Sequence, residues 1–204
     1  MMKFKKVFLV SALWLLSTFA FAEDAKQTLR AKLATLNTIQ TNFAQTVTDI
    51  NGEVVHEASG ELVMQRPNQL RWHTQLPDEV LLLADGTTVW QLDYFVEQVT
   101  ALTQDDAVTN NPMMLLTSSD DNDWQQFDVV LNGTEFSITS LNEGPIRTLT
   151  LVYENGELSE IVTLDSQQQT SRLVLIEPTF NTVLPTGLFE PELPDGFVLD
   201  DQRS

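Results

Sequence analysis

Few residues in this chain of 204 could do chemistry, and their spacing does not form a catalytic site. His56 precedes Glu57, but the second histidine that a zinc protease needs four residues on is missing. His73 lies beside Trp72 in a strand-like stretch, where an ordinary hydrogen-bonded histidine is expected. The chain has no cysteine, and no serine stands in the Gly-x-Ser-x-Gly pattern of a hydrolase nucleophile. We therefore predict no catalytic residue and no cofactor.

Carboxylates are numerous but do not single out a site. The acidic run at 120–123 offers oxygen ligands for calcium, but it lacks the glycine and the distal glutamate of an EF-hand loop. We expect a solvated loop there and no metal site. A glycosidase with a pair of acids stays open, because no pair stands out among 29 acidic residues.

Arg66 is the remaining candidate, in the turn Arg66-Pro67-Asn68 between two predicted strands. Its side chain has five N–H donors in a fixed planar arrangement. The residues alone allow an ordinary exposed arginine, or one that points into a cavity and holds backbone carbonyls there.

The first 22 residues are typical of a secretory signal peptide. A basic start is followed by an apolar run at 7–19 and by the small-residue frame Ala20-Phe21-Ala22. That run is shorter than the roughly 20 apolar residues that a membrane helix needs. We expect cleavage between Ala22 and Glu23, which leaves one periplasmic domain over 23–204. Because Glu23 stands where a bacterial lipoprotein has its acylated cysteine, we expect no lipid anchor.

The charge balance narrows the class of partner. The formal net charge is −18 at pH 7, and loss of the signal peptide leaves eight basic residues against 29 acidic ones. Such a surface repels phosphate, so nucleic acid and stable membrane association are both disfavoured. It favours solubility, or a protein partner with a basic docking face. We expect a monomer whose stability comes from packing, since no disulfide can form.

Hydrophobic periodicity predicts one helix followed by a mainly β chain. Leu29, Leu33 and Leu36 have helical spacing within 24–37, and from Ile39 the period shifts to two. Tight turns with glycine separate the later strands. These strands are expected at 58–65, 70–75, 79–84, 88–92, 96–102, 126–131, 135–140, 147–153, 158–164, 171–176 and 196–199. This pattern predicts an antiparallel sandwich or barrel.

The segment Asn111-Pro112-Met113-Met114-Leu115-Leu116 interrupts the strands. Pro112 suits the first turn of a short helix with Asn111 as its cap. Four consecutive apolar residues cannot share one helical face, so apolar groups must meet this helix on more than one side. The residues alone favour a core helix that plugs one end of the barrel.

Several short stretches, in this order and spacing, resemble the LolA family of periplasmic outer-membrane lipoprotein carriers. The resemblance covers the whole mature chain, although each motif is weak by itself. The stretches are Phe43-Ala44-Gln45, Gly60 to Trp72, Phe95 to Gln98, Pro112 to Leu116, Asp123 to Gln126 and Asp200 to Arg203.

The resemblance implies a half-open antiparallel β-barrel, covered by a helical lid, with a hydrophobic cavity for the acyl chains of a lipoprotein. It implies that cargo comes from an inner-membrane ABC transporter and goes to an outer-membrane lipoprotein receptor. Arg66 would gate the lid by holding backbone carbonyls at 113–116. Leu70 stands at a position where some relatives have an aromatic residue. We expect the cavity residues Leu33, Leu36, Phe43, Leu70, Trp72, Trp90, Met113, Met114, Leu115 and Leu116.

Three other functions stay open at this point. A lipocalin-like protein would bind small free lipids with the same barrel. A hydrolase would need an acid pair that the sequence does not reveal. A receptor of the same fold in the outer membrane would need the missing cysteine.

Overall fold

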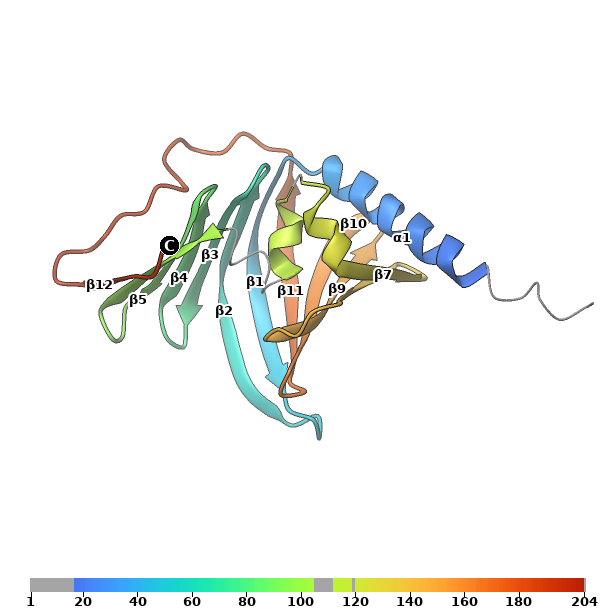
Figure 1. Ribbon diagram of the computed structural model, residues 1–204. Coiled ribbons are helices and arrows are strands. Elements are labelled where there is room, and N and C mark those ends of the chain that lie inside the picture. The colour runs from blue at the N-terminus through green and yellow to red at the C-terminus, as the bar shows by residue number, and fades with distance from the viewer. Residues whose placement is uncertain (1–16, 105–111, 119, 204) are drawn as a thin grey trace, which may run out of the picture.

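The computed structural model describes residues 17–104, 112–118 and 120–203, and it consists of one curved sheet with helices at its concave side (Figure 1). The side chains of 17–23, Pro112 and Met114 lie outside this description. The long helix is α1 (Ser17–Ala34), and two 3₁₀ helices are η1 (Pro112–Leu116) and η2 (Asp123–Gln126). The strands are β1 (Thr38–Thr48), β2 (Val54–Gln65), β3 (Gln69–Leu76), β4 (Val80–Asp85), β5 (Thr88–Asp93), β6 (Gln98–Thr103), β7 (Phe127–Asn132), β8 (Glu135–Ser140), β9 (Ile146–Glu154), β10 (Glu157–Asp165), β11 (Thr170–Phe180) and β12 (Val198–Asp201).

The sheet has twelve strands in the order β12-β6-β5-β4-β3-β2-β1-β11-β10-β9-β8-β7. Neighbouring strands are antiparallel, as predicted, except that β12 runs parallel to β6. Within the described residues β12 and β7 form the two edges and do not pair with each other. The predicted half-open barrel is therefore confirmed as a mainly β fold, in the form of an open, curved sheet.

The helix α1 differs from its predicted bounds at both ends. It begins at Ser17 rather than near residue 24, and it ends at Ala34, three residues before the predicted end at 37. Leu29 and Leu33 are buried in the main core, as their spacing predicted. The helix lies against the β7 side of the sheet (Figure 1).

Strand alternation separates the apolar residues into two clusters on opposite faces of the sheet. The concave cluster includes Phe43, Leu70 and Leu173, together with Leu29 and Leu33 of α1. On β1, Phe43 is buried while its neighbours in the strand are exposed, so one face of this strand turns toward the concave core.

The convex cluster is covered by the segment that follows β11, which crosses the outside of the sheet before it forms β12 (Figure 1). Trp90 lies in this cluster beside Phe189. Its indole Nε1 donates to Asp85 at 2.9 Å, and the Arg203 guanidinium lies 4.9 Å from its ring centroid. The prediction that Trp90 lines the cavity is therefore wrong, because this side chain points to the opposite face of β5.

Candidate functional site

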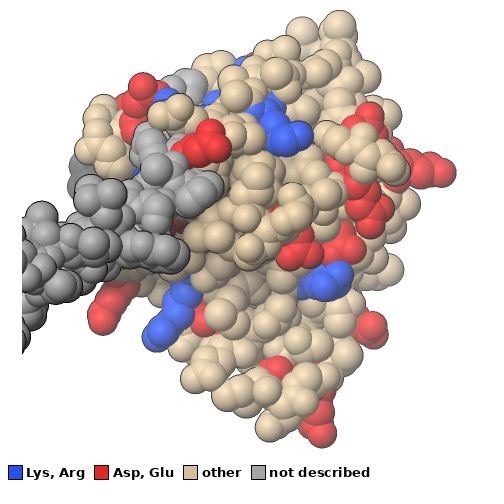
Figure 2. All heavy atoms as spheres, turned by 90° about the vertical axis from the view of Figure 1, so that its right-hand side faces the viewer, with Lys and Arg blue, Asp and Glu red and all other residues tan. Residues whose placement is uncertain are grey.

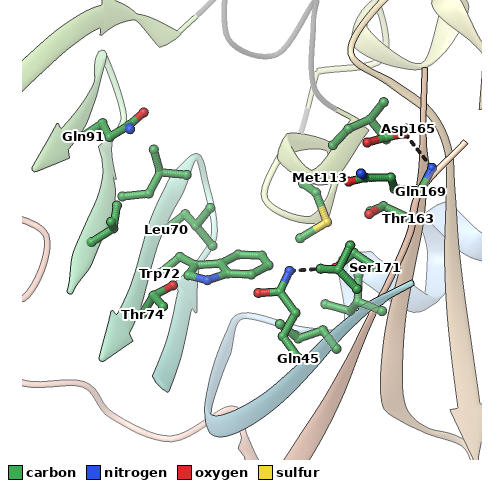
Figure 3. Close-up of a pocket in the computed structure, with 16 residues that line it drawn as sticks. Gln45, Leu70, Trp72, Thr74, Gln91, Met113, Thr163, Asp165, Gln169 and Ser171 are labelled. Carbon is green, nitrogen blue, oxygen red and sulfur yellow. Dashed lines mark hydrogen bonds between the residues drawn. The ribbon is translucent and has the colours of Figure 1, made fainter. Parts of the chain in front are cut away.

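A cavity of about 480 Å³ lies in the concave face of the sheet and is open to solvent on one side (Figure 3). Strands from both halves of the sheet contribute its walls, and η1 contributes Met113. The lining residues are Gln45, Val47, Leu70, Trp72, Thr74, Val80, Leu82, Gln91, Met113, Ile146, Ile161, Thr163, Asp165, Gln169, Ser171 and Leu173.

Aromatic and aliphatic side chains form the inner wall of this cavity. The ring centroids of Trp72 and Phe43 are 5.4 Å apart in an edge-to-face arrangement, so Phe43 supports Trp72 from the core. Leu70 and Leu173 are almost completely buried where they meet the cavity. This wall suits an apolar ligand.

The helix η1 closes the cavity from the concave side. Met113, Leu115 and Leu116 are all buried, with exposed fractions of 5% or less. Burial of consecutive residues is possible because the helix sits between the sheet and neighbouring core residues, as its apolar run required. It is a 3₁₀ helix, while Asn111, the predicted cap, lies outside the described residues.

Arg66 holds the segment that follows η1. Its Nη1 donates to the Leu116 carbonyl at 3.1 Å, and its Nη2 donates to the Ser118 carbonyl. The backbone N–H of Asn68, in the same turn, donates to the Thr117 carbonyl at 3.1 Å. Leu116 lies within the predicted range 113–116, and Ser118 lies two residues beyond it. Three successive carbonyls of this segment thus accept hydrogen bonds from the β2–β3 turn.

Buried polar contacts fix the turn that carries Arg66. Gln104 is 4% exposed, and its Nε2 donates to the Asn68 carbonyl at 2.8 Å. Its Oε1 accepts from the backbone N–H of Gly86 at 3.1 Å. The backbone N–H of Arg66 itself donates to the Asn37 carbonyl at 2.8 Å. The β2–β3 turn is therefore held by Gln104 and by Asn37, and Gly86 fixes Gln104 in turn, which places the guanidinium against the 116–118 segment.

The guanidinium of Arg66 is partly removed from water. Burial lowers the pKa of Arg66 from its ordinary value. An arginine nevertheless stays charged at neutral pH. Its contacts to two carbonyls are thus charge-assisted, which makes them stronger than bonds between neutral groups.

The segment after residue 118 is held from the other side by α1. Lys26 Nζ donates to the Trp124 carbonyl at 3.3 Å, and Arg30 forms an ion pair with Asp121. Trp124 in η2 is 4% exposed. Sequence reasoning expected a solvated loop at 120–123, and it missed η2 and the burial of this tryptophan.

The predicted cavity residues fall into five groups. Leu70, Trp72 and Met113 line the cavity. Leu33, Phe43, Leu115 and Leu116 lie behind it in the concave core. Leu36 is half-buried and lines a separate groove with Lys32 and Tyr153. Trp90 is on the convex face, and the side chain of Met114 lies outside the described residues.

Polar lining residues were missed by the sequence analysis. Gln45 follows Phe43 by two residues, and the period of two from Ile39 puts both on one face of the strand, which was a usable signal. The position of Thr163, Asp165 and Ser171 in the cavity wall depends on the pairing of β10 with β11, in which Thr163 lies opposite Ser171. The sequence gives no signal for this pairing.

Surface charge, possible metal ligands and helix hydrophobicity add to the picture of the described residues. Figure 2 shows acidic side chains spread over one face, with a few basic ones between them. No group of three or more histidine, aspartate or glutamate residues in the described ranges could hold a metal ion. No described helix has the length and apolar character needed to cross a membrane.

Comparison with known proteins identifies the family. The family model described as outer membrane lipoprotein carrier protein LolA matches residues 34–192. This chain belongs to the LolA family. An outer-membrane lipoprotein carrier protein of Aeromonas salmonicida is 38% identical over 201 residues, which covers 98% of this chain and 100% of that protein. Its counterpart in Shewanella amazonensis is 37% identical over 185 residues, 90% of this chain and 91% of that protein.

Solved structures support the LolA fold at much lower identity. A LolA superfamily protein of Nitrosomonas europaea matches with a TM-score of 0.51 and 12% identity, covering 82% of this chain and 98% of that one. An uncharacterised conserved protein of Thermus thermophilus matches with a TM-score of 0.54 and 12% identity, over 88% and 99% of the two chains. At this identity the likeness concerns the fold alone.

Proposed function

We propose that this LolA-family chain carries lipoproteins through the periplasm with their acyl chains in the concave cavity. The observation that supports this proposal best is a largely apolar cavity, one wall of which is Met113 of the short helix η1. Arg66 holds the end of that helix through the Leu116 carbonyl. The proposed role is binding and handover rather than catalysis. Bacterial relatives named outer-membrane lipoprotein carrier proteins support it over nearly the full chain.

Acyl chains need such a carrier because their exposure to water is costly. For a lipoprotein with three chains of about 15 methylenes each, exposure of the chains to water would cost tens of kcal/mol of free energy, at roughly 0.8 kcal/mol per methylene. Noncovalent affinity in water saturates near about −18 to −21 kcal/mol, so a cavity cannot extract this cargo from a bilayer unaided. We therefore propose that an inner-membrane ABC transporter drives loading.

The size of the cavity supports a lid that moves. If a methylene needs about the volume of a water molecule, roughly 30 Å³, then 480 Å³ holds roughly 16 methylenes. That is room for about one acyl chain. Cargo with three chains requires a larger cavity, and η1, which contributes Met113, is the part of the wall that is not a strand of the sheet.

Arg66 is the proposed gate of this lid. Its two contacts to the Leu116 and Ser118 carbonyls join the lid to the β2–β3 turn without a covalent bond. A closure worth a few kcal/mol can be shifted by cargo or by a partner, because such a ligand only has to bind one state better. Release then requires an outer-membrane receptor that binds the acyl chains more tightly than this cavity does.

The proposed route begins with export. We propose that residues 1–22 are a cleaved signal peptide, and that residues 23–204 act in the periplasm as a single domain. Intact-mass analysis of protein purified from the periplasm should give a chain that begins at Glu23. A chain that keeps residues 1–22 would contradict this part of the proposal.

The identity of the bound ligand distinguishes the carrier from a binder of free lipids, which a cavity with room for about one acyl chain also favours. The protein should be purified from the periplasm of cells that express a tagged lipoprotein, and analysed by native mass spectrometry. A carrier gives a one-to-one complex with the lipoprotein. Free fatty acids as the only bound species would support the lipid binder instead.

A further inference from the structure

Two neighbouring strands that line the cavity, β10 and β11, change from apolar to polar side chains in the same direction. On β10 the cavity residues run from Ile161 through Thr163 to Asp165, and on β11 from Leu173 to Ser171. Ile161 pairs with Leu173, and Thr163 pairs with Ser171, so the change occurs at the same level in both strands. The cavity therefore has an apolar end and a polar end.

Strands β1 and β3 add polar groups toward this end, while Val47 on β1, which pairs with Ser171, and Val80 on β4, which pairs with Thr74, keep apolar side chains there. On β1 the buried Phe43 is followed by the half-buried Gln45, and on β3 the cavity residue Trp72 is followed by Thr74. Gln45 Nε2 donates to Ser171 Oγ at 2.7 Å across the cavity wall (Figure 3). The second N–H of this amide and the hydroxyls of Thr163 and Ser171 are groups that can donate to a ligand.

Asp165 is the only charged residue among the described residues that line the cavity. Its Oδ1 accepts the backbone N–H groups of Gln167 and Gln169, each at 2.8 Å, which fixes the carboxylate at the β10–β11 turn (Figure 3). No lysine or arginine is among those lining residues. The formal net charge of −18 adds a repulsive field of the same sign.

This arrangement distinguishes two kinds of lipid head. In an acylated N-terminal cysteine, ester and amide groups join the chains to the protein, and their carbonyl oxygens accept hydrogen bonds. Such groups lose water when they enter a cavity, so donors must replace it. A phospholipid of the same chain length adds a phosphate, which would approach Asp165 without a basic partner.

We propose that the polar end of the cavity binds the ester and amide carbonyls of the acylated cysteine, and that Asp165 excludes phosphate-bearing lipids. This selectivity rests on the proposed carrier function. It would let the chain bind acylated protein in a compartment bounded by phospholipid membranes, without filling its cavity with phospholipid.

The test measures displacement of the neutral dye Nile red from the exported chain by two competitors with the same acyl chains. One is a tripalmitoylated cysteine peptide with an amidated C-terminus, and the other is dipalmitoylphosphatidylglycerol. The variant Asp165→Asn keeps an oxygen for the two backbone N–H groups but removes the charge. Asp128→Asn, on the exposed face of β7, is the matched control.

We expect Asp165→Asn to reduce the preference for the peptide over phosphatidylglycerol about tenfold, mainly through tighter phosphatidylglycerol binding. The control should keep the preference of the original chain. An unchanged preference in Asp165→Asn would overturn the role of Asp165. If the peptide does not displace the dye from the original chain, the carrier function itself fails, which is a distinct result.

A second variant tests the donors separately from the charge. Thr163→Val removes one hydroxyl with little change of shape. We expect a loss of about three- to tenfold in affinity for the acylated peptide, because one hydrogen bond to the ligand is lost. The affinity for hexadecane, which has no carbonyl, should not fall. Equal losses for both ligands would show that Thr163 contributes only to the shape of the cavity.

Discussion

Replacing Arg66 by leucine should loosen the lid while leaving the sheet folded. The change removes the donors to the Leu116 and Ser118 carbonyls. A hydrogen bond from a charged donor is worth about 1.5–3 kcal/mol. Arg66 is only half-buried, and water can reach part of the freed surface, so we expect a net loss of about 2 kcal/mol in lid closure. That corresponds to roughly a 30-fold increase in the lid-opening equilibrium.

The remaining contacts should keep the lid closed for most of the time. The bond from Asn68 to the Thr117 carbonyl does not involve the side chain that is changed. Leu115 and Leu116 also stay in the core, where their burial favours the closed state. We therefore expect faster local opening rather than an unfolded segment.

Hydrogen–deuterium exchange of the backbone amides at 113–118 measures this opening directly. In Arg66→Leu these amides should exchange roughly 30-fold faster, while the amides of β1 and β11 keep their rates. The matched control is Arg172→Leu, which removes an exposed arginine of β11 that pairs with Glu160 of β10. Unchanged exchange at 113–118 in Arg66→Leu would refute the assignment of Arg66 to lid closure.

Four further variants test the two faces of the sheet and its core. Binding of an acylated peptide should change the tryptophan fluorescence through Trp72 in the cavity wall, so Trp72→Phe should lose most of the change and Trp90→Phe should keep it. The reverse result would mean that the ligand binds the convex face. Tyr153 is buried, its Oη has no hydrogen-bond partner among the described residues, and burial raises the pKa of Tyr153 to about 12. Between pH 10 and 12 the unfolded chain therefore ionises first and stability falls with rising pH, by about 1.4 kcal/mol at pH 11. Tyr153→Phe should be as stable as the original chain or more stable at pH 7, and should lack this loss in urea unfolding at pH 11. An equal loss of stability at pH 11 in both proteins would mean that a group other than Tyr153 causes it. A Cβ at Gly60 would lie 1.9 Å from the carbonyl oxygen of His73, so Gly60→Ala should lower the free energy of unfolding by about 3 kcal/mol or more. A loss below about 1 kcal/mol in urea unfolding would show that β2 and β3 can separate at this point.

The sequence predicted the positions of most strands along the chain well because alternation and glycine turns are local signals. The period of two from Ile39, for example, puts Ile39, Thr41 and Phe43 on one face, and the structure buries all three. The helix bounds were less accurate. Helical spacing of leucines marks the buried side of α1, but it does not determine where the helix begins or ends.

Trp90 shows why alternation alone misplaced a residue. Apolar residues lie on both faces of β5, since Val89 meets the concave core while Trp90 and Leu92 lie in the convex cluster. An apolar residue in such a strand has no sequence signal for its face. The assignment depends on a contact with residues such as Phe189, about a hundred positions along the chain.

The polar contacts around the lid depend on tertiary structure in the same way. Gln104 reaches Asn68 and Gly86 only because their turns meet at one end of the sheet. A single glutamine in a sequence gives no indication of such contacts. The resemblance to the LolA family singled out Arg66, whereas the residues that hold its turn in place required the structure.

The most direct test of the carrier function is transfer of a labelled lipoprotein between purified membranes. Inner-membrane vesicles that hold the lipoprotein and its ABC transporter are incubated with ATP and the mature chain, and the soluble fraction is then added to outer-membrane vesicles. The account predicts a soluble one-to-one complex after the first step and labelled lipoprotein in the outer-membrane vesicles after the second. If the lipoprotein stays in the inner-membrane vesicles while a known carrier of the LolA family releases it in parallel, the account is contradicted.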